Sequence, residues 1–327
     1  MRDPVHGLIV FREGVPVDEL AWRLLDAAEF QRLRRIKQLG VSEFVYPGAT
    51  HTRLAHCIGV FHTARKLLEV IRREIGPLYN EQRAEIALIA ALLHDVGHGP
   101  FSHTFEEVQK SRNVKKRHEL WTADIIENPD GELRTILEAH RTGFASEVAT
   151  LLKSENPSDI YHAVVSSSFD ADRLDYLRRD RMMTGTGAGA IDFDWLLEHV
   201  RIDDVNIEAD DDTDGAMVPT FCLDLKALPA AEQFLLSRYT LHEQVYFHKA
   251  TRCIEQMIAS LLRKVASASS DPGEIRRIGL RPEHPLVSFF AEASPSVTAY
   301  LRLDDAVVLS AFGEIAMTET EEGTLAR

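Results

Sequence analysis

Residues 94–103 have the sequence His-Asp-Val-Gly-His-Gly-Pro-Phe-Ser-His, and they decide how the rest of the chain is interpreted. The stretch holds three histidines and one aspartate, and it follows a run of residues that is almost entirely apolar from Ile86 onward. Histidine is the commonest metal ligand in proteins and the usual proton carrier near neutral pH. We therefore expect a metal site here, with hydrolysis of phosphate esters as its chemistry.

Apolar residues at helical spacing surround this stretch and predict a mostly α fold. Helices are expected over 18–39, 52–75, 81–94, 118–127, 132–140, 144–153, 158–165, 169–183 and 229–266. Residues 200–207 and 217–223 are typical of the two strands of a hairpin, joined by the acidic segment 208–214. The expected architecture is a helical domain over 1–266 with a small β-hairpin appendage, followed by a mixed C-terminal region over 267–327.

Composition limits the class of protein. The chain has 327 residues, a formal net charge of −14 and three cysteines without a CxxC pair. An acidic surface argues against a protein that coats nucleic acid, because contacts to phosphate dominate that affinity. No run of about 18 apolar residues is present, and the N-terminus lacks the apolar core of a signal peptide. We expect a soluble cytoplasmic protein with reduced thiols and no membrane partner.

Four residues from three predicted helices form a candidate metal site. His56 lies near the start of its helix, His94 and Asp95 end a buried helix, and Asp172 lies on the helix 169–183. Two imidazoles and two carboxylates suit Mn, Fe, Zn or Ni and leave positions open for water and phosphate. Adjacent residues at a helix end can both reach one ion, whereas neighbours within a helix diverge by about 100°.

A second pattern lies on the predicted helix 229–266. Arg238, His242, Tyr246 and Lys249 are spaced i, i+4, i+8 and i+11, so they share one face of a continuous helix. A basic and aromatic stripe of this kind fits a nucleotide that lies along the helix.

The order His56, His94-Asp95, Asp172 resembles the signature of the HD-domain phosphohydrolases. The resemblance extends to the deoxynucleoside triphosphate triphosphohydrolase branch, which includes the animal enzyme with a sterile alpha motif. The stretches that carry it are 3–7, 30–34, 37–40, 46–53, 94–103, 172–176 and 238–249, so it covers roughly residues 1–260. It implies an HD-type helical fold, a divalent transition metal at the four ligands, and Mg²⁺ with the substrate phosphates.

The resemblance also implies catalytic roles. His98, His103 and His118 are similar to the catalytic and phosphate-binding histidines, with Glu119 holding His118. His103 resembles the general acid that protonates the leaving 5′ oxygen. Glu106 stands behind His103 where the family has an aspartate, so its side chain is one methylene longer.

The resemblance also implies which residues contact the substrate. Residues similar to phosphate ligands are Arg53, Arg173, Arg238 and Lys249, and those similar to residues around the sugar and the rest of the nucleotide are Gln38, Leu39, Tyr176, His242 and Tyr246. Tyr246 resembles the ring that packs under deoxyribose and excludes a 2′ hydroxyl. Phe247 replaces a glutamine of the animal enzyme, so we expect different contacts to the base.

The implied reaction is attack of a metal-activated water on the α-phosphorus, which releases deoxynucleoside and triphosphate. One alternative is an HD phosphohydrolase acting on nucleoside monophosphates, cyclic nucleotides or another ester. Another is a nucleotide-sensing or nucleic-acid-binding protein with a vestigial site. The resemblance implies a homo-oligomer. Asp26, Gln31 and Arg34 are similar to residues that read a guanine activator. Alternatively, these three residues cap and brace the helix 18–39. The C-terminal region is shorter than the region that completes the family's activator pocket.

Several polar residues have simpler interpretations. We expect His6, His51 and His62 to be structural, Cys57 to be a small buried thiol, and Asp175 to have a structural role. Asp170 either caps its helix or lies on the surface as a charge.

Overall fold

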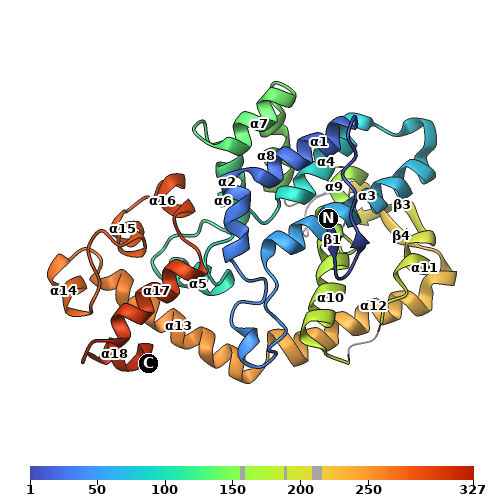
Figure 1. The fold of residues 1–327 in the computed structure, drawn as a ribbon. Helices are drawn as coiled ribbons and strands as arrows, with labels where there is room; N and C mark the ends of the chain where they lie inside the picture. The colour runs from blue at the N-terminus through green and yellow to red at the C-terminus, as the bar shows by residue number, and fades with distance from the viewer. Residues whose placement is uncertain (155–158, 188–189, 208–215) are drawn as a thin grey trace.

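The computed structural model describes residues 1–154, 159–187, 190–207 and 216–327. The helices in chain order are α1 Pro16–Asp26, α2 Ala28–Gln31, η1 Arg32–Arg35, η2 Ser42–Phe44, α3 Arg53–Ile75, η3 Gly76–Leu78, α4 Glu81–Leu93, α5 His103–Ser111, α6 His118–Ile126, α7 Glu132–His140, α8 Phe144–Lys153, α9 Ile160–Ala163, α10 Ala171–Thr184, α11 Phe193–Glu198, η4 Leu225–Ala227, α12 Leu228–Leu241, η5 His242–Tyr246, α13 Lys249–Ala268, α14 Pro272–Arg277, α15 Pro285–Ala291, α16 Val297–Leu301, α17 Asp305–Ala316 and α18 Glu321–Ala326. The strands are β1 Arg2–Asp3, β2 Gly7–Leu8, β3 Val200–Ile207 and β4 Ala216–Leu223. The mostly α fold class is confirmed (Figure 1).

Helices α3, α4 and α10 form the part of the core that holds the candidate site (Figure 1). From Ile86 to Leu93 every residue of α4 is buried, as its apolar sequence predicts. Gly59 lets α3 approach α10 closely, because a Cβ there would lie 2.0 Å from Asp175 Oδ1. This close approach brings His56 of α3 to the first turn of α10.

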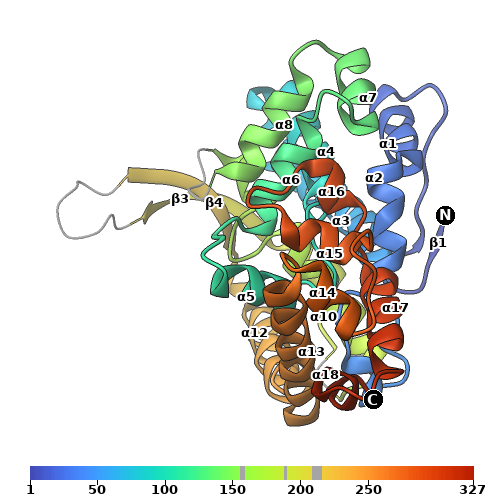
Figure 2. The ribbon, with the colours of Figure 1, turned by 90° about the vertical axis from the view of Figure 1, so that its left-hand side faces the viewer.

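The predicted hairpin is confirmed. Strands β3 and β4 pair antiparallel, from Val200 opposite Leu223 to Ile207 opposite Ala216. Figure 2 shows them projecting from the helical body. The acidic segment 208–214, expected to join them, lies outside the described residues.

The prediction of one continuous helix over 229–266 is wrong. Helix α12 ends at Leu241, a π-helical turn follows over His242–Tyr246, and α13 begins only at Lys249. His248 adopts an extended conformation, and its side chain accepts a hydrogen bond from the backbone N–H of Ala250 at 3.3 Å, so it caps a new helix. Single π-helical turns inside α-helices are frequent at functional sites.

The helix expected over 18–39 is also interrupted. Ala27 has extended dihedral angles, so a new helix begins at Ala28. The backbone N–H of Ala28 donates to Glu132 Oε2 of α7 at 2.7 Å. Gln31 donates to the carbonyl of Leu25 at 2.5 Å and accepts from Arg34 at 2.6 Å. These contacts show Gln31 and Arg34 bracing this segment, which was one of the two interpretations.

The C-terminal region 267–327, expected to be of mixed character, consists of short helices. Figure 1 shows α14–α18 gathered at one end of the molecule, beside α5 and α13. Within the described ranges, no helix is long and apolar enough to cross a membrane.

Candidate metal centre and substrate pocket

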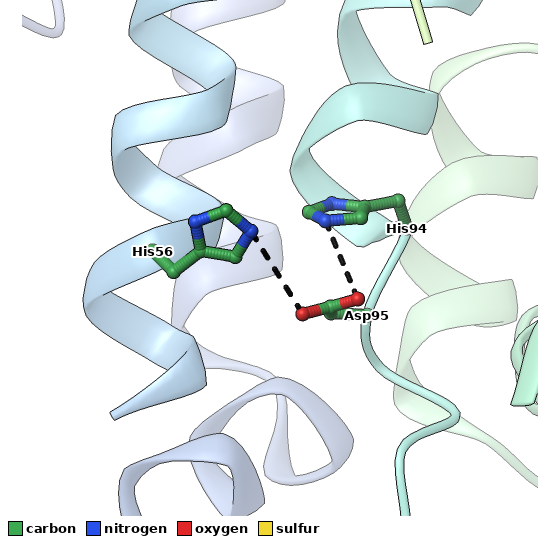
Figure 3. Close-up of side chains that lie close together, drawn as sticks. All are labelled: His56, His94 and Asp95. Carbon is green, nitrogen blue, oxygen red and sulfur yellow. Dashed lines mark ion pairs between the residues drawn. The ribbon is translucent and has the colours of Figure 1, made fainter. Parts of the chain in front are cut away.

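The four predicted metal ligands converge. His56 Nε2 lies 2.9 Å from Asp172 Oδ1, and His94 Nε2 lies 3.3 Å from Asp95 Oδ1 and 3.9 Å from Asp172 Oδ1. Figure 3 shows the imidazoles of His56 and His94 facing the carboxylate of Asp95. One donor atom from each of His56, His94 and Asp95 lies within 4.8 Å of the other two. These residues are therefore positioned to bind a divalent metal ion.

The donor set itself fits a cation. The Nε2 atoms of His56 and His94 are both buried and face carboxylate oxygens, at 2.9 Å from Asp172 Oδ1 and 3.3 Å from Asp95 Oδ1. Burial lowers the pKa of His56, but hydrogen bonds and charges from Asp172 and Asp175 outweigh burial and raise it to about 10. Carboxylates that favour a proton on this imidazole also favour a metal ion in its place.

Asp175 holds His56 in position, which the sequence analysis did not predict beyond a structural role. Its carboxylate lies 2.8 Å from His56 Nδ1 and 2.5 Å from His6 Nε2, and it accepts from Arg179 Nε at 2.8 Å. Arg179 in turn donates to Asp3 at 2.8 Å. The segment 3–7 therefore closes a buried network behind the metal ligand. Asp172 and Asp175 lie three residues apart, on one face of the helix. This spacing was the sequence signal that could have indicated that Asp175 lies near the metal ligands.

We expect Asp175→Asn to weaken divalent-metal affinity by about 10–100-fold, because a carboxylate behind a ligating histidine fixes its tautomer and ring orientation. Titration of the metal against a competing chelator measures this effect. Asp180→Asn is the matched control, since Asp180 is also buried on α10 and contacts a histidine, His51, at 2.8 Å. Equal affinities for Asp175→Asn and the parent protein would contradict the prediction.

Arg53 connects the predicted metal ligand Asp95 to the residues that follow it, 96–103, which we call the histidine-rich loop. Its guanidinium donates to Asp95 and, at 2.9 Å, to Ser102 Oγ. Burial raises the pKa of Asp95, but the charges of Arg53, His94 and His98 hold it well below its usual range. Burial and the charge of Arg53 also lower the pKa of His98 well below its usual range. The loop therefore presents an ionised aspartate beside a neutral imidazole.

The three predicted catalytic histidines lie together. The rings of His98 and His118 stack with centroids 3.9 Å apart, and the His103 centroid is 5.7 Å from that of His98. Glu106 Oε1 lies 2.7 Å from His118 Nδ1 and accepts from the His118 backbone N–H at 2.9 Å. Its second oxygen lies 3.4 Å from His103 Nδ1.

One carboxylate thus serves two histidines. Glu119, expected to hold His118, lies farther from its Nδ1, at 3.6 Å. Burial lowers the pKa of His118, but its hydrogen bond to Glu106 and the nearby carboxylate charges raise it above its usual value overall. The extra methylene of Glu106 gives it the reach to contact both rings.

A cavity of about 820 Å³ lies beside this cluster. Among the predicted residues, its lining contains His94, Asp95, Asp172, His98, His103, His118, Glu119, Gln38, Leu39, Arg53, Arg173, Tyr176, His242 and Tyr246. This volume is within the range of small-molecule sites. Arg238 and Lys249 are absent from the lining in the described parts of the chain. Lys249 is exposed and starts α13, so the break at 247–248 removes it from the face expected to hold all four residues.

Tyr246 is fixed at the cavity wall by a residue that the sequence analysis did not single out. Its hydroxyl donates to Asp180 at 2.7 Å, and Asp180 also lies 2.8 Å from His51 Nε2. Burial and the adjacent Asp180 raise the pKa of Tyr246 well above its ordinary value. The remaining simpler interpretations hold: Cys57 is buried, and the Asp170 side chain caps α10 by accepting from the Arg173 backbone N–H at 2.8 Å.

Two family models match the chain. The HD domain matches residues 53–180, and the HD associated region matches residues 212–303. Among curated relatives, an "Uncharacterized protein YwfO" from Bacillus subtilis is 33% identical over 95% of this chain and 65% of its own length. A "Deoxynucleoside triphosphate triphosphohydrolase SAMHD1 homolog" from Dictyostelium discoideum is 30% identical over 84% of this chain and 52% of its own length.

Solved structures are similar over most of the fold. A phosphohydrolase from Bacteroides thetaiotaomicron has a TM-score of 0.79 at 29% identity, covering 100% of this chain and 75% of that one. A hypothetical protein from Aquifex aeolicus has a TM-score of 0.72 at 30% identity, covering 96% of this chain and 71% of that one. The chain spans less than two thirds of the length of the two curated relatives above.

Proposed function

Because the chain belongs to the HD-domain family, we propose that it is a metal-dependent phosphohydrolase that converts deoxynucleoside triphosphates to deoxynucleosides and triphosphate. The observation that carries this proposal is one cavity that brings together several of the predicted residues: the metal ligands His94, Asp95 and Asp172, the histidines His98, His103 and His118, the arginines Arg53 and Arg173, and the fixed Tyr246. The name of the Dictyostelium relative supports the same substrate class.

The metal-ligand end of the cavity is where the α-phosphate would lie. A divalent ion, which His56, His94, Asp95 and Asp172 would hold, would act as a Lewis acid and would lower the pKa of a bound water toward neutrality. Arg53, which donates to Asp95, lines the same end and offers positive charge to the phosphate oxygens. Arg173 adds a second cation and is oriented by the Ser167 carbonyl, to which it donates at 2.6 Å.

The leaving oxygen needs a proton, and His103 is the proposed donor. Its side chain is 74% exposed and lines the cavity, with Nδ1 facing Glu106. Burial raises the pKa of Glu106, but His103 and His118 lower it well below its usual range, so this carboxylate stays ionised and favours protonated imidazoles. His98 and His118 border the phosphate path beside it.

Another group of lining residues suits a deoxyribose. Tyr246 is tied to Asp180 and meets Tyr176 edge to face, with centroids 6.3 Å apart, so its ring cannot easily move away from a bound sugar. Gln38 and Leu39 line the same cavity. A fixed ring against the sugar discriminates against an added 2′ hydroxyl, because its position does not adapt.

Product identification tests the proposed function. The protein is incubated with each of the four dNTPs and the matching NTPs, with Mn²⁺ or Mg²⁺ and with or without GTP, and the products are separated by anion-exchange chromatography. We expect tripolyphosphate and deoxynucleoside in equal amounts, with little product from NTPs. Release of orthophosphate or pyrophosphate, or turnover of monophosphates alone, would refute the triphosphohydrolase and favour another phosphoester substrate.

A further inference from the structure

The histidine-rich loop contains a strained backbone. Phe101 and Ser102 have φ angles of 51° and 48°, and neither is a glycine. Two consecutive L-residues in this region are unfavourable by themselves, and such conformations persist only where the surrounding structure fixes them. The contacts that fix this loop therefore bear on how His98 and His103 are presented.

One side chain from the C-terminal region contacts two loops of the cavity. Asp305 is 4% exposed, and its Oδ1 accepts from the Phe101 backbone N–H at 2.8 Å. Its Oδ2 accepts from the Lys37 backbone N–H, also at 2.8 Å. Each oxygen of one buried carboxylate thus holds a different loop through a charge-assisted hydrogen bond. The first loop carries His98 and His103, and the second carries Gln38 and Leu39.

Neighbouring contacts hold the same region. Arg32 is buried and donates to the carbonyls of Leu303 at 2.7 Å and His98 at 2.9 Å. Tyr300 donates to the Gly97 carbonyl at 2.7 Å, and its ring stacks on Trp121 with centroids 4.0 Å apart. The segment 300–305 therefore contacts the histidine-rich loop at Gly97 and Phe101, and through Arg32 it is linked to His98.

From these contacts we propose that Tyr300, Leu303 and Asp305 form a clasp that sets the geometry of the cavity, with Asp305 as its central positioning residue. Asp305 acts through the two backbone amides and does not line the cavity. As far as the clasp affects turnover, the proposal rests on the proposed function. The effect of the clasp on the order of the two loops does not depend on the proposed function.

The adjacent residue provides a matched control. Asp304 is buried like Asp305, but its Oδ1 accepts from the Val307 N–H at 3.0 Å to cap α17, and its Oδ2 accepts from Arg35 Nε at 2.5 Å. Neither oxygen contacts the amides of Lys37 or Phe101. Loss of Asp304 therefore perturbs the same helix start without removing the two clasp bonds.

Hydrogen exchange followed by mass spectrometry tests the clasp without substrate. In Asp305→Ala, we expect amide exchange in peptides covering 36–40 and 99–103 to rise at least tenfold, with metal content unchanged and kcat reduced at least tenfold. Asp305→Asn keeps the shape but only one acceptor oxygen, so exchange should rise in one loop. Asp304→Ala should leave both peptides at the parental rate.

The proposal is overturned if exchange in both loops stays parental in Asp305→Ala and Asp305→Asn, or if Asp304→Ala accelerates it equally. If the parent protein hydrolyses no dNTP, the proposed function fails while the exchange measurements still decide the role of Asp305. If dNTP hydrolysis occurs but is unaffected by loss of Asp305, the clasp fails as a positioning device while the proposed function stands.

Discussion

His94→Ala is expected to remove the bound metal and all detectable hydrolysis. His94 Nε2 is buried, lacks a hydrogen-bond partner among the described residues, and faces the carboxylates of Asp95 and Asp172. Alanine removes one of the two nitrogen donors that would hold the ion beside Asp95 and Asp172. Without the metal, no bound water is acidified and an important source of charge stabilisation is lost. Metal content by mass spectrometry and dNTP turnover are the two measurements.

His140→Ala is the matched control for this variant. His140 has a similarly limited exposure, 16% against 13% for the His94 side chain, and it pairs with Glu85 at 2.8 Å. It should keep full metal content and turnover. Turnover that persists in His94→Ala would refute the metal assignment, and metal retained without turnover would restrict the role of His94 to a later step.

The second large effect is expected for His103→Ala. Removing a general acid slows a reaction by about 10²–10⁴-fold. Because the His103 side chain is 74% exposed, its loss should change the melting temperature little. Metal content and nucleotide binding should remain, so single-turnover kinetics should show slower chemistry at saturating substrate. Nucleotide binding is measured with a non-hydrolysable analogue.

Lys110→Ala serves as the comparison, since Lys110 is exposed on the same helix, α5, as His103. It should react at the parental rate. Parental turnover in His103→Ala would exclude His103 as the acid. A parallel loss of metal would show instead that the variant disturbs the centre.

Local patterns were sufficient to predict the helices that bring His56, His94, Asp95 and Asp172 together. The helices expected over 52–75, 81–94 and 169–183 form close to their expected bounds. The hairpin followed from the two strand-like runs 200–207 and 217–223. These features depend on residues close in sequence, for which periodicity is a direct signal.

What the sequence could not supply depends on contacts between distant residues. Asp175 was expected to be structural, but its partner could not be predicted: His56 of α3 lies 2.8 Å away. The role of Asp180 likewise depends on its contacts with Tyr246 and His51. The break after Tyr246 was missed because no proline or glycine marks it, and a histidine at 248 provides the cap. Glu106 rather than Glu119 holds His118, because Glu106 Oε1 lies 2.7 Å from His118 Nδ1 and the Glu119 carboxylate lies 3.6 Å away. These distances depend on the placement of α5 relative to α6 and could not be predicted from sequence spacing.

The contacts of the clasp have a consequence for the order in which the protein is completed during synthesis. They join residues far apart in the chain, with Phe101 and Asp305 separated by 204 positions and Arg32 and Leu303 by 271. At about 5–20 residues per second, the segment 300–305 is translated on the order of ten seconds after Asp172. A nascent chain therefore contains all four predicted metal ligands before it contains the residues that hold the histidine-rich loop. We expect a chain that ends before residue 305 to bring the predicted ligands together but to lack the two amide contacts of Asp305.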